Sequence, residues 1–576
     1  MYIYPSISYK YMEKRWVLKS ETDKEKVKSL AQELNISSVL SQLLIQRGVQ
    51  TFSEAKAFFR PSMDALHDPF LIKDMDLAIT RIEKAIAQNE KILIYGDYDV
   101  DGTTAVSLLY NFLRDYYPHI DTYIPNRYDE GYGISLAGID YAQQHAYTLV
   151  IALDCGIRSL QEVAYATALN IDFIIGDHHI PGEELPEAVA VLDPHRADCP
   201  YPYRDLSGCG IAFKIAHAFL KRKNLNTNVL NKYLDLLAVS IISDIVPVTG
   251  ENRLMAQLGL AQLNKSPCAG LKALVKLQDK YQKIGVREIL FQIAPRINAA
   301  GRMDHALQVV NMLTTKDPEK AKCIAEEIDR FNEERKSLDK RITGEALSLL
   351  DKEKSHPDKQ KLNLAYRPDW HKGVVGIVAS RVIERLYRPT IILTKSKGKI
   401  TGSARSVHGI DIHNLLSQCE ELLEKFGGHP FAAGMTLAEK NLPEFLKKMH
   451  NLANTCIPDD LLVEQIRIDS YIALREIDNK FFTILRQFEP HGPKNPRPIF
   501  LSKKVEVVGS PYIIGTNHLK FAVKQGDSAI FDCIGFGLGD EVDLLIKTSY
   551  IDICYSITEN KWNGKNSIQL DVKGVK

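Results

Sequence analysis

Residues 91–104, KILIYGDYDVDGTT, hold a short apolar run that ends in three aspartates and then opens a helix-like stretch. An apolar run of this length with a polar boundary is typical of a buried strand. The same texture returns in TLVIALDCGI at 148–157, DFIIGDHH at 172–179 and AVAVLDPH at 188–195. Helix-like stretches between them have the length of right-handed crossovers. The pattern predicts an α/β fold with a doubly wound, largely parallel sheet.

The chain as a whole has 576 residues, more than one hydrophobic core can serve, because single cores stop growing near about 250–300 residues. Changes in pattern mark the boundaries: a long charged helical stretch, then a polar stretch with a proline at 351–361, and alternating strand-like segments near the end. The expected parts are a helical lead-in at 1–75, a catalytic domain at 76–315, a connecting helix at 316–355, a smaller α/β domain at 356–458 and an OB-like β-barrel at 459–576.

Composition excludes several classes of protein. Apolar residues make up 45% and charged residues 25%, as in ordinary folded proteins. The net charge of +1 does not indicate a uniformly basic nucleic-acid binder, although a local basic groove is compatible with it. The nine cysteines form no C-x-x-C pair, and the N-terminus shows no apolar core of a signal peptide. We therefore expect a cytoplasmic protein without membrane attachment.

Carboxylates and imidazoles follow nearly every predicted strand. Ligands of open parallel sheets bind beyond the carboxyl ends of the strands, so these side chains are expected to converge. So many acids would repel one another unless a cation neutralised them. Oxygen ligands with one or two imidazoles and no thiolate favour Mn²⁺ or Mg²⁺ over zinc, and we expect two ions. The side chains are Asp97, Asp99, Asp101, Asp154, Asp177, His178, His179, Asp193 and Asp244.

A plainer explanation exists for each of these aspartates, because Asp after a strand is a common N-cap of the following helix. Caps do not require adjacent histidines, however, so the set as a whole favours a metal site. Two metal ions beside a phosphate ester would polarise the phosphoryl oxygen and lower the pKa of a bridging water. The residues alone therefore predict phosphoester hydrolysis.

Four segments in order, YGDYDVDGTT, ALDCGI, GDHH and ISDIVP, resemble the signature motifs of the DHH phosphoesterases. With RINAAGRMDHA at 296–306, the resemblance extends over about residues 90–310 and points to the exonuclease branch of that superfamily. It implies a single-stranded-DNA-specific 5′-to-3′ exonuclease that uses two metal ions and releases mononucleotides in DNA repair and recombination.

The same resemblance implies roles for the site residues. Asp154 would bridge the two ions, Asp177 would orient the histidine pair, and His179 would contact the phosphate or assist the leaving group. A lone arginine is more often a surface residue, but inside these motifs arginines would hold the scissile phosphate. The implied metal ligands are Asp99, Asp101, Asp154, His178 and Asp244, the catalytic groups are His179, Asp97 and Asp177, and the arginines are Arg127 and Arg296.

Three later segments, at 369–381, 401–406 and 427–434, resemble the DHH-associated domain, whose Gly-rich loops cradle phosphates with backbone N–H groups. Alone, GGHPFAAG at 427–434 would indicate a tight turn followed by close helix packing. Its position after the DHH motifs favours substrate binding. The implied substrate-binding residues are His371, Ser403, Arg405, Gly428 and His429.

The segment QFEPHGPKNPRP at 487–498 resembles the family's linker into an OB-like domain. Related chains tend to show G-x-G-N there, whereas this chain has Gly492-Pro493-Lys494-Asn495, which leaves the role of the loop undecided. Barrel aromatics are candidates for base stacking, although we expect about half of them to fill the core. The candidates are Tyr512, Phe521, Phe531 and Phe536.

Two other functions stay open. A DHH phosphodiesterase acting on short oligonucleotides or cyclic dinucleotides would not need the third domain or so long a chain. A non-catalytic scaffold that binds single strands would be expected to lose metal ligands, and all five are present. The expected partners are single-stranded DNA, a single-strand-binding protein and a helicase, and the chain is expected to be a monomer.

Overall fold

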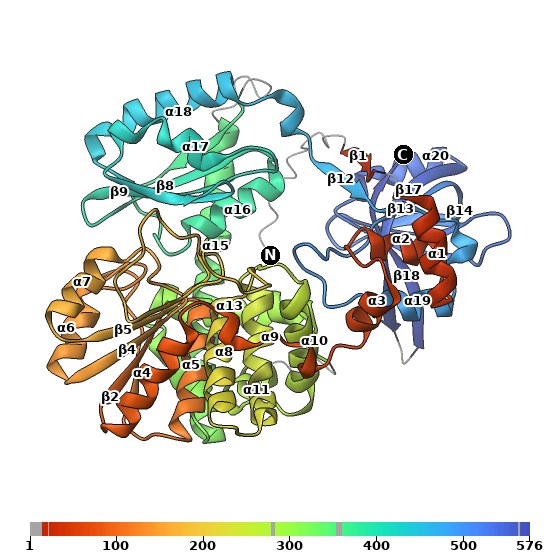
Figure 1. Cartoon of the computed structure of the whole chain (residues 1–576). Coiled ribbons are helices and arrows are strands. Elements are labelled where there is room, and N and C mark those ends of the chain that lie inside the picture. The colour runs from red at the N-terminus through yellow and green to blue at the C-terminus, as the bar shows by residue number, and fades with distance from the viewer. Residues whose placement is uncertain (1–13, 21, 278–282, 353–359, 563–564) are drawn as a thin grey trace. The chain divides into compact units, whose positions relative to one another are not determined.

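Two compact units make up the chain (Figure 1). The first unit comprises Arg47–Glu333 together with Arg486–Arg497, and the second unit holds the other residues. Most of the polar linker expected at 351–361 and the first part of the lead-in lie outside the residues that the structure describes. Among the described residues, no helix has the length and apolarity needed to cross a membrane. The computed structural model describes residues 14–20, 22–277, 283–352, 360–562 and 565–576.

A five-stranded parallel sheet forms the centre of the first unit. Side chains of its strand β2 (Lys91–Gly96) alternate between two buried clusters: Ile92 and Ile94 join one, and Leu93 and Tyr95 join the other. Strands that are buried on both faces have continuous apolar runs, which explains the sequence texture. The predicted doubly wound parallel sheet is confirmed. The strand order is β3 (Ile120–Tyr123), β2, β4 (Tyr147–Leu153), β5 (Asp172–Gly176) and β6 (Ala190–Leu192).

Helices cover both faces of this sheet. Helices α6 and α7 pack on β4 and β5 from one side, and α8 packs on the same strands from the other, beside α5 (Figure 1). The crossovers therefore use both faces of the sheet, as expected for a doubly wound sheet. The bounds are α4 (Met75–Ala87), α5 (Val100–Arg114), α6 (Leu136–Gln144), α7 (Leu160–Ala168) and α8 (Gly208–Arg222).

Helices α9 (Leu234–Ser243) and α10 (Gly250–Lys265) cross closely beside the sheet. Gly259 allows this approach, because a Cβ there would lie 2.1 Å from the carbonyl oxygen of Leu234. The crossing matters for the site, since α9 ends directly before Asp244. Other helices of this unit are α3 (Phe52–Phe59), α11 (Ala269–Lys276), α12 (Val286–Glu288), α13 (Ala294–Met303) and α14 (Leu307–Thr314).

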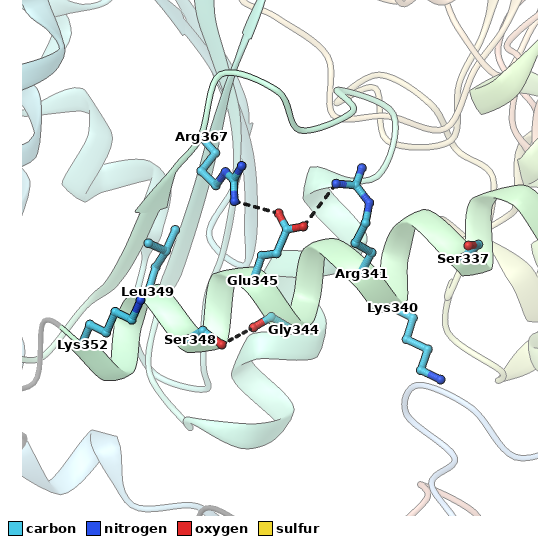
Figure 2. Close-up of a pocket in the computed structure, with 9 residues that line it drawn as sticks. All are labelled: Ser337, Lys340, Arg341, Gly344, Glu345, Ser348, Leu349, Lys352 and Arg367. Atoms are coloured by element: carbon cyan, nitrogen blue, oxygen red, sulfur yellow. Dashed lines mark hydrogen bonds and ion pairs between the residues drawn. The ribbon is translucent and has the colours of Figure 1, made fainter. Parts of the chain in front are cut away.

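The predicted long connecting helix is confirmed as α15 (Pro318–Lys352). In the second unit, its residues Ile342 and Ala346 are buried against Val378 of the following α/β region. Glu345 adds polar contacts: it pairs with Arg341 and with Arg367, as Figure 2 shows. The same stretch lines an open pocket of about 570 Å³ with a mixture of basic and small side chains. The lining residues are Ser337, Lys340, Arg341, Gly344, Glu345, Ser348, Leu349, Lys352 and Arg367.

A smaller mixed sheet follows α15 in the second unit, which confirms the expected second α/β region. Strand β7 (Asn363–Tyr366) runs parallel to β8, and the remaining neighbours pair antiparallel. The strand order is β10 (Lys425–His429), β11 (Ala432–Leu437), β9 (Lys399–Arg405), β8 (Thr390–Ser396) and β7, with helices α16 (Val375–Arg385), α17 (Ile412–Ser417) and α18 (Leu442–Cys456).

The C-terminal strands close into a barrel. Strand β14 pairs with β15 on one side and with β17 on the other, so β14, β15, β16, β18 and β17 form a ring. This ring confirms the predicted OB-like fold. The bounds are β14 (Phe500–Ile514), β15 (His518–Lys524), β16 (Phe531–Phe536), β17 (Tyr550–Trp562) and β18 (Lys565–Val575), with α19 (Asn479–Arg486), β13 (Ser470–Tyr471) and α20 (Val542–Lys547) beside them.

The four candidate aromatics of the barrel divide evenly between core and surface. Phe521 and Phe531 are 4% and 5% exposed and fill the interior. Tyr512 and Phe536 are 51% and 56% exposed and remain available for stacking. The expectation that about half of them belong to the core is confirmed.

The N-terminal segment of the second unit contains the helices expected for the lead-in and one strand that the sequence did not indicate. Strand β1 (Arg15–Leu18) pairs in parallel with β12 (Gln465–Ile468), which lies some 450 positions later in the chain. The helices are α1 (Lys24–Leu34) and α2 (Ser38–Ile45).

We predict that Gly259→Ala destabilises the first unit. Although alanine is the better helix former, its methyl group would meet the Leu234 carbonyl, and overpacking of this kind costs about 1–3 kcal/mol. Urea denaturation followed by circular dichroism should show a lower midpoint. Gly182→Ala is the control, because its Cβ would meet its nearest atom, the carbonyl oxygen of Glu184, at an ordinary 3.5 Å. Equal midpoints for both variants would contradict the prediction.

Candidate metal centre

Three aspartates follow strand β2 and begin the site. Asp99 is the N-cap of α5, and its carboxylate accepts a hydrogen bond of 3.1 Å from the backbone N–H of Gly102. The N-cap explanation is therefore correct for Asp99, but it uses only one of the two carboxylate oxygens. Asp97 is almost fully buried, and its Oδ1 has no hydrogen-bond partner among the described residues. A buried carboxylate oxygen without a donor is suited to a cation.

Asp101 is fixed by the helix opposite. Its carboxylate accepts hydrogen bonds from the backbone N–H groups of Gly208 at 2.6 Å and Cys209 at 2.9 Å, at the start of α8. The Ser240 hydroxyl donates to it as well, at 2.6 Å. A helix N-terminus stabilises negative charge, so Asp101 remains in place although it is buried. Gly208 is required here because a Cβ would lie 2.6 Å from the Cβ of Asp154.

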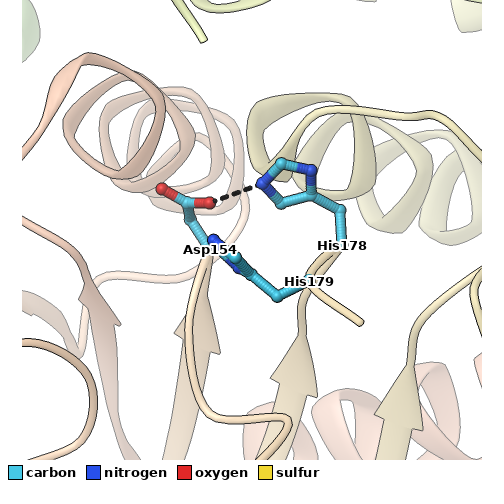
Figure 3. Close-up of side chains that lie close together, drawn as sticks. All are labelled: Asp154, His178 and His179. Carbon is cyan, nitrogen blue, oxygen red and sulfur yellow. Dashed lines mark hydrogen bonds and ion pairs between the residues drawn. The ribbon is translucent and has the colours of Figure 1, made fainter. Parts of the chain in front are cut away.

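His178 lies at the centre of the acids. Its Nε2 is 3.0 Å from Oδ1 of Asp154, and Figure 3 shows the two side chains facing each other. The same nitrogen lies 3.7 Å from Oδ2 of Asp101 and 3.6 Å from Oδ2 of Asp244. Asp244 comes from the C-terminal end of helix α9. The structure thus brings acids from two strand ends and one helix end to a single imidazole.

Two sets of potential ligand atoms share this cluster. Among the described residues, one set is Asp97, Asp99 and Asp154, and another is Asp101, His178 and Asp244, each with ligand atoms within 4.8 Å of one another. Asp154 connects the sets, because it belongs to the first and contacts His178 of the second. A third set combines Asp154, His178 and His179. All five predicted metal ligands therefore lie together, and Asp97 is a further member of the cluster.

The pKa values of the clustered aspartates show that their negative charges are unfavourable without a cation. Burial raises the pKa of Asp154 well above its ordinary value, and repulsion from Asp101 and Asp99 raises it further. Asp244 shows the same upward shift for the same two reasons. Burial followed by repulsion from Asp99 raises the pKa of Asp97 as well. Divalent cations reverse this penalty by supplying the missing charge, so the residues present fit a dinuclear Mn²⁺ or Mg²⁺ centre.

Asp177 accepts hydrogen bonds from both histidines of the pair, but it contacts the ring of only one of them. Its carboxylate accepts hydrogen bonds from the backbone N–H groups of Ile157, His178 and His179 at 2.8–3.2 Å. Only the ring of His179 contacts it, through Nδ1 at 2.7 Å. Burial alone would raise the pKa of Asp177, but these donors and the histidine charges lower it to about 2. The ring of His178 is thereby left to face the acids.

Tyr132 is a contact residue that the sequence motifs did not indicate. Its hydroxyl lies 3.1 Å from Nε2 of His179 and 3.4 Å from the backbone oxygen of Asp154. The residue belongs to the segment IPNRYDEGYGIS at 124–135, which drew attention through Arg127. The motif therefore indicated that residues 124–135 belong to the site. Only the fold shows which side chain of this segment contacts His179.

Arg127 lies beside the cluster. Its guanidinium carbon is 4.8 Å from the centroid of the Tyr98 ring, and its charge counteracts the upward shift in the pKa of Asp97. Arg302 lies near the same ring: burial raises the pKa of Tyr98 to about 12, and both arginines oppose that rise. Arg302 belongs to the segment RINAAGRMDHA, in which the family resemblance implied a role for the other arginine, Arg296.

Arg296 is engaged elsewhere in the first unit. Its Nε donates to Oδ1 of Asp329 at 2.7 Å, and its Nη1 donates to the carbonyl oxygen of Gln292 at 2.7 Å. The side chain is buried. These contacts form a buried ion pair with Asp329.

Four of the five predicted substrate residues of the second unit lie on strands β9 and β10, which flank β11, whereas a Gly-rich loop was expected at residues 427–434. Residues 427–434 are instead a hairpin of β10 and β11, because β9 offers β11 a full set of hydrogen-bond partners. The register places Arg405 and His429 on either side of Ala432. Arg405 Nη1 donates to the Ser403 hydroxyl at 2.9 Å.

Helix α16 approaches these strands through a glycine. A Cβ on Gly376 would lie 3.0 Å from the Ser403 hydroxyl oxygen and 3.1 Å from Nη2 of Arg405. Gly428, at a φ of +146°, leaves no room for a side chain against the Ala432 carbonyl. His371 lies in the turn before α16, where its Nδ1 accepts from the Gly373 N–H at 3.1 Å. Four of the five candidates thus lie on β9 and β10, and His371 lies in the turn before α16.

Comparison with known proteins finds three matching domain families in this chain. The chain matches the DHH family N-terminal domain at residues 91–241, the DHHA1 domain at 359–455 and the RecJ OB domain at 468–574. It is 36% identical over 564 residues to the single-stranded-DNA-specific exonuclease RecJ of Bacillus subtilis strain 168, covering 97% of this chain and 70% of the relative.

Solved structures agree over nearly the whole chain. The crystal structure of RecJ in complex with Mn²⁺ from Thermus thermophilus aligns with a TM-score of 0.83 and 27% identity, covering 98% of this chain and 79% of that one. The corresponding complex with Mg²⁺ aligns with a TM-score of 0.78 and 26% identity, covering 98% and 78%.

We predict that Mn²⁺ stabilises the first unit against unfolding. At about 100 times its dissociation constant, a ligand that binds only the folded state adds about 2.7 kcal/mol. Thermal melts with and without Mn²⁺, after treatment with a chelator, measure the shift. Asp244→Asn should reduce it, because the amide removes one charged ligand, while Asp198→Asn on the surface of the same unit should not. Equal shifts in both variants would show that Mn²⁺ binds elsewhere.

Proposed function

Since the chain belongs to the RecJ family of single-stranded-DNA-specific exonucleases, we propose that it degrades single-stranded DNA from the 5′ end and releases mononucleotides in DNA repair and recombination. It is a metal-dependent nuclease, and its ions are Mn²⁺ or Mg²⁺. The observation that carries the proposal is the convergence of three buried or part-buried aspartates, Asp101, Asp154 and Asp244, on the ring of His178, with Asp97 and Asp99 beside Asp154. The ordered family motifs supply the polarity.

Two cations are proposed because two sets of ligand atoms meet at Asp154. Asp97, Asp99 and Asp154 would hold one ion, and Asp101, His178 and Asp244 would hold the other, with Asp154 between them. Bound cations of this kind polarise a phosphoryl oxygen and stabilise both the attacking and the leaving oxygen of an in-line displacement. The protein contributes a rigid, pre-arranged frame, since Asp101 is anchored by α8 and Asp177 by three backbone N–H groups.

The groups around the cluster are proposed to handle the substrate. His179, held between Asp177 and Tyr132, is placed to hold or donate a proton at the leaving oxygen. Arg127 and Arg296 are proposed to hold the scissile phosphate, because guanidinium groups bind phosphate through paired donors. Arg296 also pairs with Asp329, and Arg302, whose charge acts on Tyr98, is a further candidate.

The second unit is proposed to bind the strand itself. His371, Ser403, Arg405, Gly428 and His429 would contact phosphates, and the exposed aromatics Tyr512 and Phe536 would stack bases. We also propose the five-part domain division given above, a monomeric chain that acts in the cytoplasm, and a single-strand-binding protein and a helicase as further partners.

We predict that Asp154→Asn lowers the rate of hydrolysis by at least about a hundred-fold, since groups that merely hold a metal ligand in place already account for about 10- to 100-fold. The assay is a time course on long 5′- and 3′-labelled single and double strands with Mn²⁺. Asp101→Ala is a poorer choice, because Asp101 accepts three buried hydrogen bonds and its loss endangers folding.

Binding of single-stranded DNA by Asp154→Asn, measured by fluorescence anisotropy, should persist, because its proposed contacts lie largely outside the acid cluster. Cleavage of di- to tetranucleotides alone by the wild-type protein would contradict the proposal and favour the small-substrate phosphodiesterase. Undiminished hydrolysis by Asp154→Asn would refute the two-metal centre.

We predict that His179→Ala slows turnover by about 100-fold or more while changing Mn²⁺ affinity less, because proton transfer by a positioned side chain contributes about 10²- to 10⁴-fold. Single-turnover rates and calorimetric Mn²⁺ titration separate the two effects. Tyr132→Phe is the matched variant, since it removes only the hydroxyl beside His179. A large loss of Mn²⁺ affinity in His179→Ala would identify this histidine as a metal ligand instead.

A further inference from the structure

Residues Arg486–Arg497 form a strap whose role the sequence left undecided. In sequence the strap lies between helix α19 and strand β14, yet it packs as part of the first unit. Phe488 is fully buried there, with ring centroids of Phe58 and Phe59 each 5.5 Å away. The strap is therefore an ordered element of the unit that holds the metal centre.

A buried arginine fastens the first half of the strap. Arg253 of α10 is 4% exposed, and its guanidinium carbon lies 3.7 Å from the centroid of the Phe58 ring. All of its hydrogen bonds that the structure shows run from Nη1 and Nη2 to backbone carbonyl oxygens at 2.9–3.2 Å, whereas its Nε has no partner among the described residues. The carbonyls belong to Gln487, Phe488, Glu489 and Phe58.

A tight turn forms the second half. Gly492 and Asn495 exchange two backbone hydrogen bonds of 3.0 Å, and the Asn495 amide donates to the carbonyls of Phe488 at 2.9 Å and Pro490 at 2.8 Å. Arg47 donates to the Asn495 side-chain oxygen at 2.7 Å. Asn495 is itself buried, so the turn has one defined shape.

This turn contacts the loop that begins at Asp244. The Pro493 carbonyl accepts a hydrogen bond of 2.9 Å from the N–H of Val248, only four residues after Asp244. Gly492 also packs against Val248 so closely that a Cβ would lie 2.4 Å from Cγ2. The strap therefore fixes the far end of a loop whose near end carries a candidate metal ligand.

The loop needs such support, because its backbone is strained. Ile245 has a φ of +61°, a left-handed conformation that a β-branched side chain rarely adopts. Strained residues persist only where the surroundings over-determine them. The carbonyl of Pro247 is held by Tyr203 and Asn252, each at 3.1 Å, and the strap holds Val248.

We propose that the strap, through the Gly492–Asn495 turn and Val248, is a positioning element that holds Asp244 in place for metal binding. The proposal rests on the proposed function in that Asp244 is taken as a metal ligand. The turn acts through the loop and does not contact the acid cluster itself. The segment in which this chain departs from the G-x-G-N pattern thus takes part in shaping the metal centre.

Mn²⁺ affinity of the full chain tests the proposal. Gly492→Ala inserts a methyl group against Val248 and should weaken Mn²⁺ binding about 10-fold, the effect typical of groups that hold a ligand in place. Isothermal titration calorimetry without DNA gives this affinity whether or not the enzyme cleaves. Arg47→Lys, which loses the donation to Asn495 but keeps the charge, is a milder variant that should fold and show a smaller loss in the same direction.

Arg497→Ala is the control, because Arg497 is exposed at the end of the strap and pairs only loosely with Glu489, at 3.8 Å. It should bind Mn²⁺ like the wild type. If folded Gly492→Ala and Arg47→Lys both retain wild-type affinity, the strap has no positioning role and the proposal is overturned. Wild-type protein that binds Mn²⁺ but leaves long single strands intact would refute the proposed function and leave this inference standing.

Discussion

Repulsion among buried carboxylates is the constraint on which the rest of this structure depends. Burial and neighbouring acids raise the pKa of Asp97, Asp154 and Asp244, so the free protein holds its acids together at a cost in stability. The sheet imposes the arrangement, because the carboxyl ends of β2, β4 and β5 meet at one edge. A bound cation would offset the repulsion among the carboxylates at this edge of the sheet.

Backbone groups around the cluster stabilise its negative charge in the metal-free protein. The N-terminus of α8 donates to Asp101, and Gly208 lets that helix approach Asp154. Asp177 accepts hydrogen bonds from backbone N–H groups and from the ring of His179. These contacts keep the pKa of Asp177 at about 2. These contacts hold the acids in place through backbone groups, which move less than side chains do. The metal centre is consequently built into the fold before any ion binds.

Much of the site was predictable from sequence, for a physical reason. Acids that directly follow buried parallel strands must share an edge, so Asp97, Asp99 and Asp154 could be grouped without coordinates. The apolar run before Asp244 indicated another strand end, but that run is helix α9, so only the fold shows how Asp244 reaches the cluster. The sequence does not show that Arg296 pairs with Asp329 or that the charge of Arg302 acts on Tyr98, because both depend on the packing of α13.

By itself the sequence determined the α/β class, the barrel, the long helix and the residue types of the metal centre, because periodicity and strand-end chemistry are local properties. Tertiary structure alone decided that residues 427–434 pair as strands, that Tyr132 reaches His179, and that the Gly492–Asn495 turn supports Val248. Each of these depends on groups that are distant in the chain and satisfy one another's hydrogen bonds, and a linear pattern does not record such pairings.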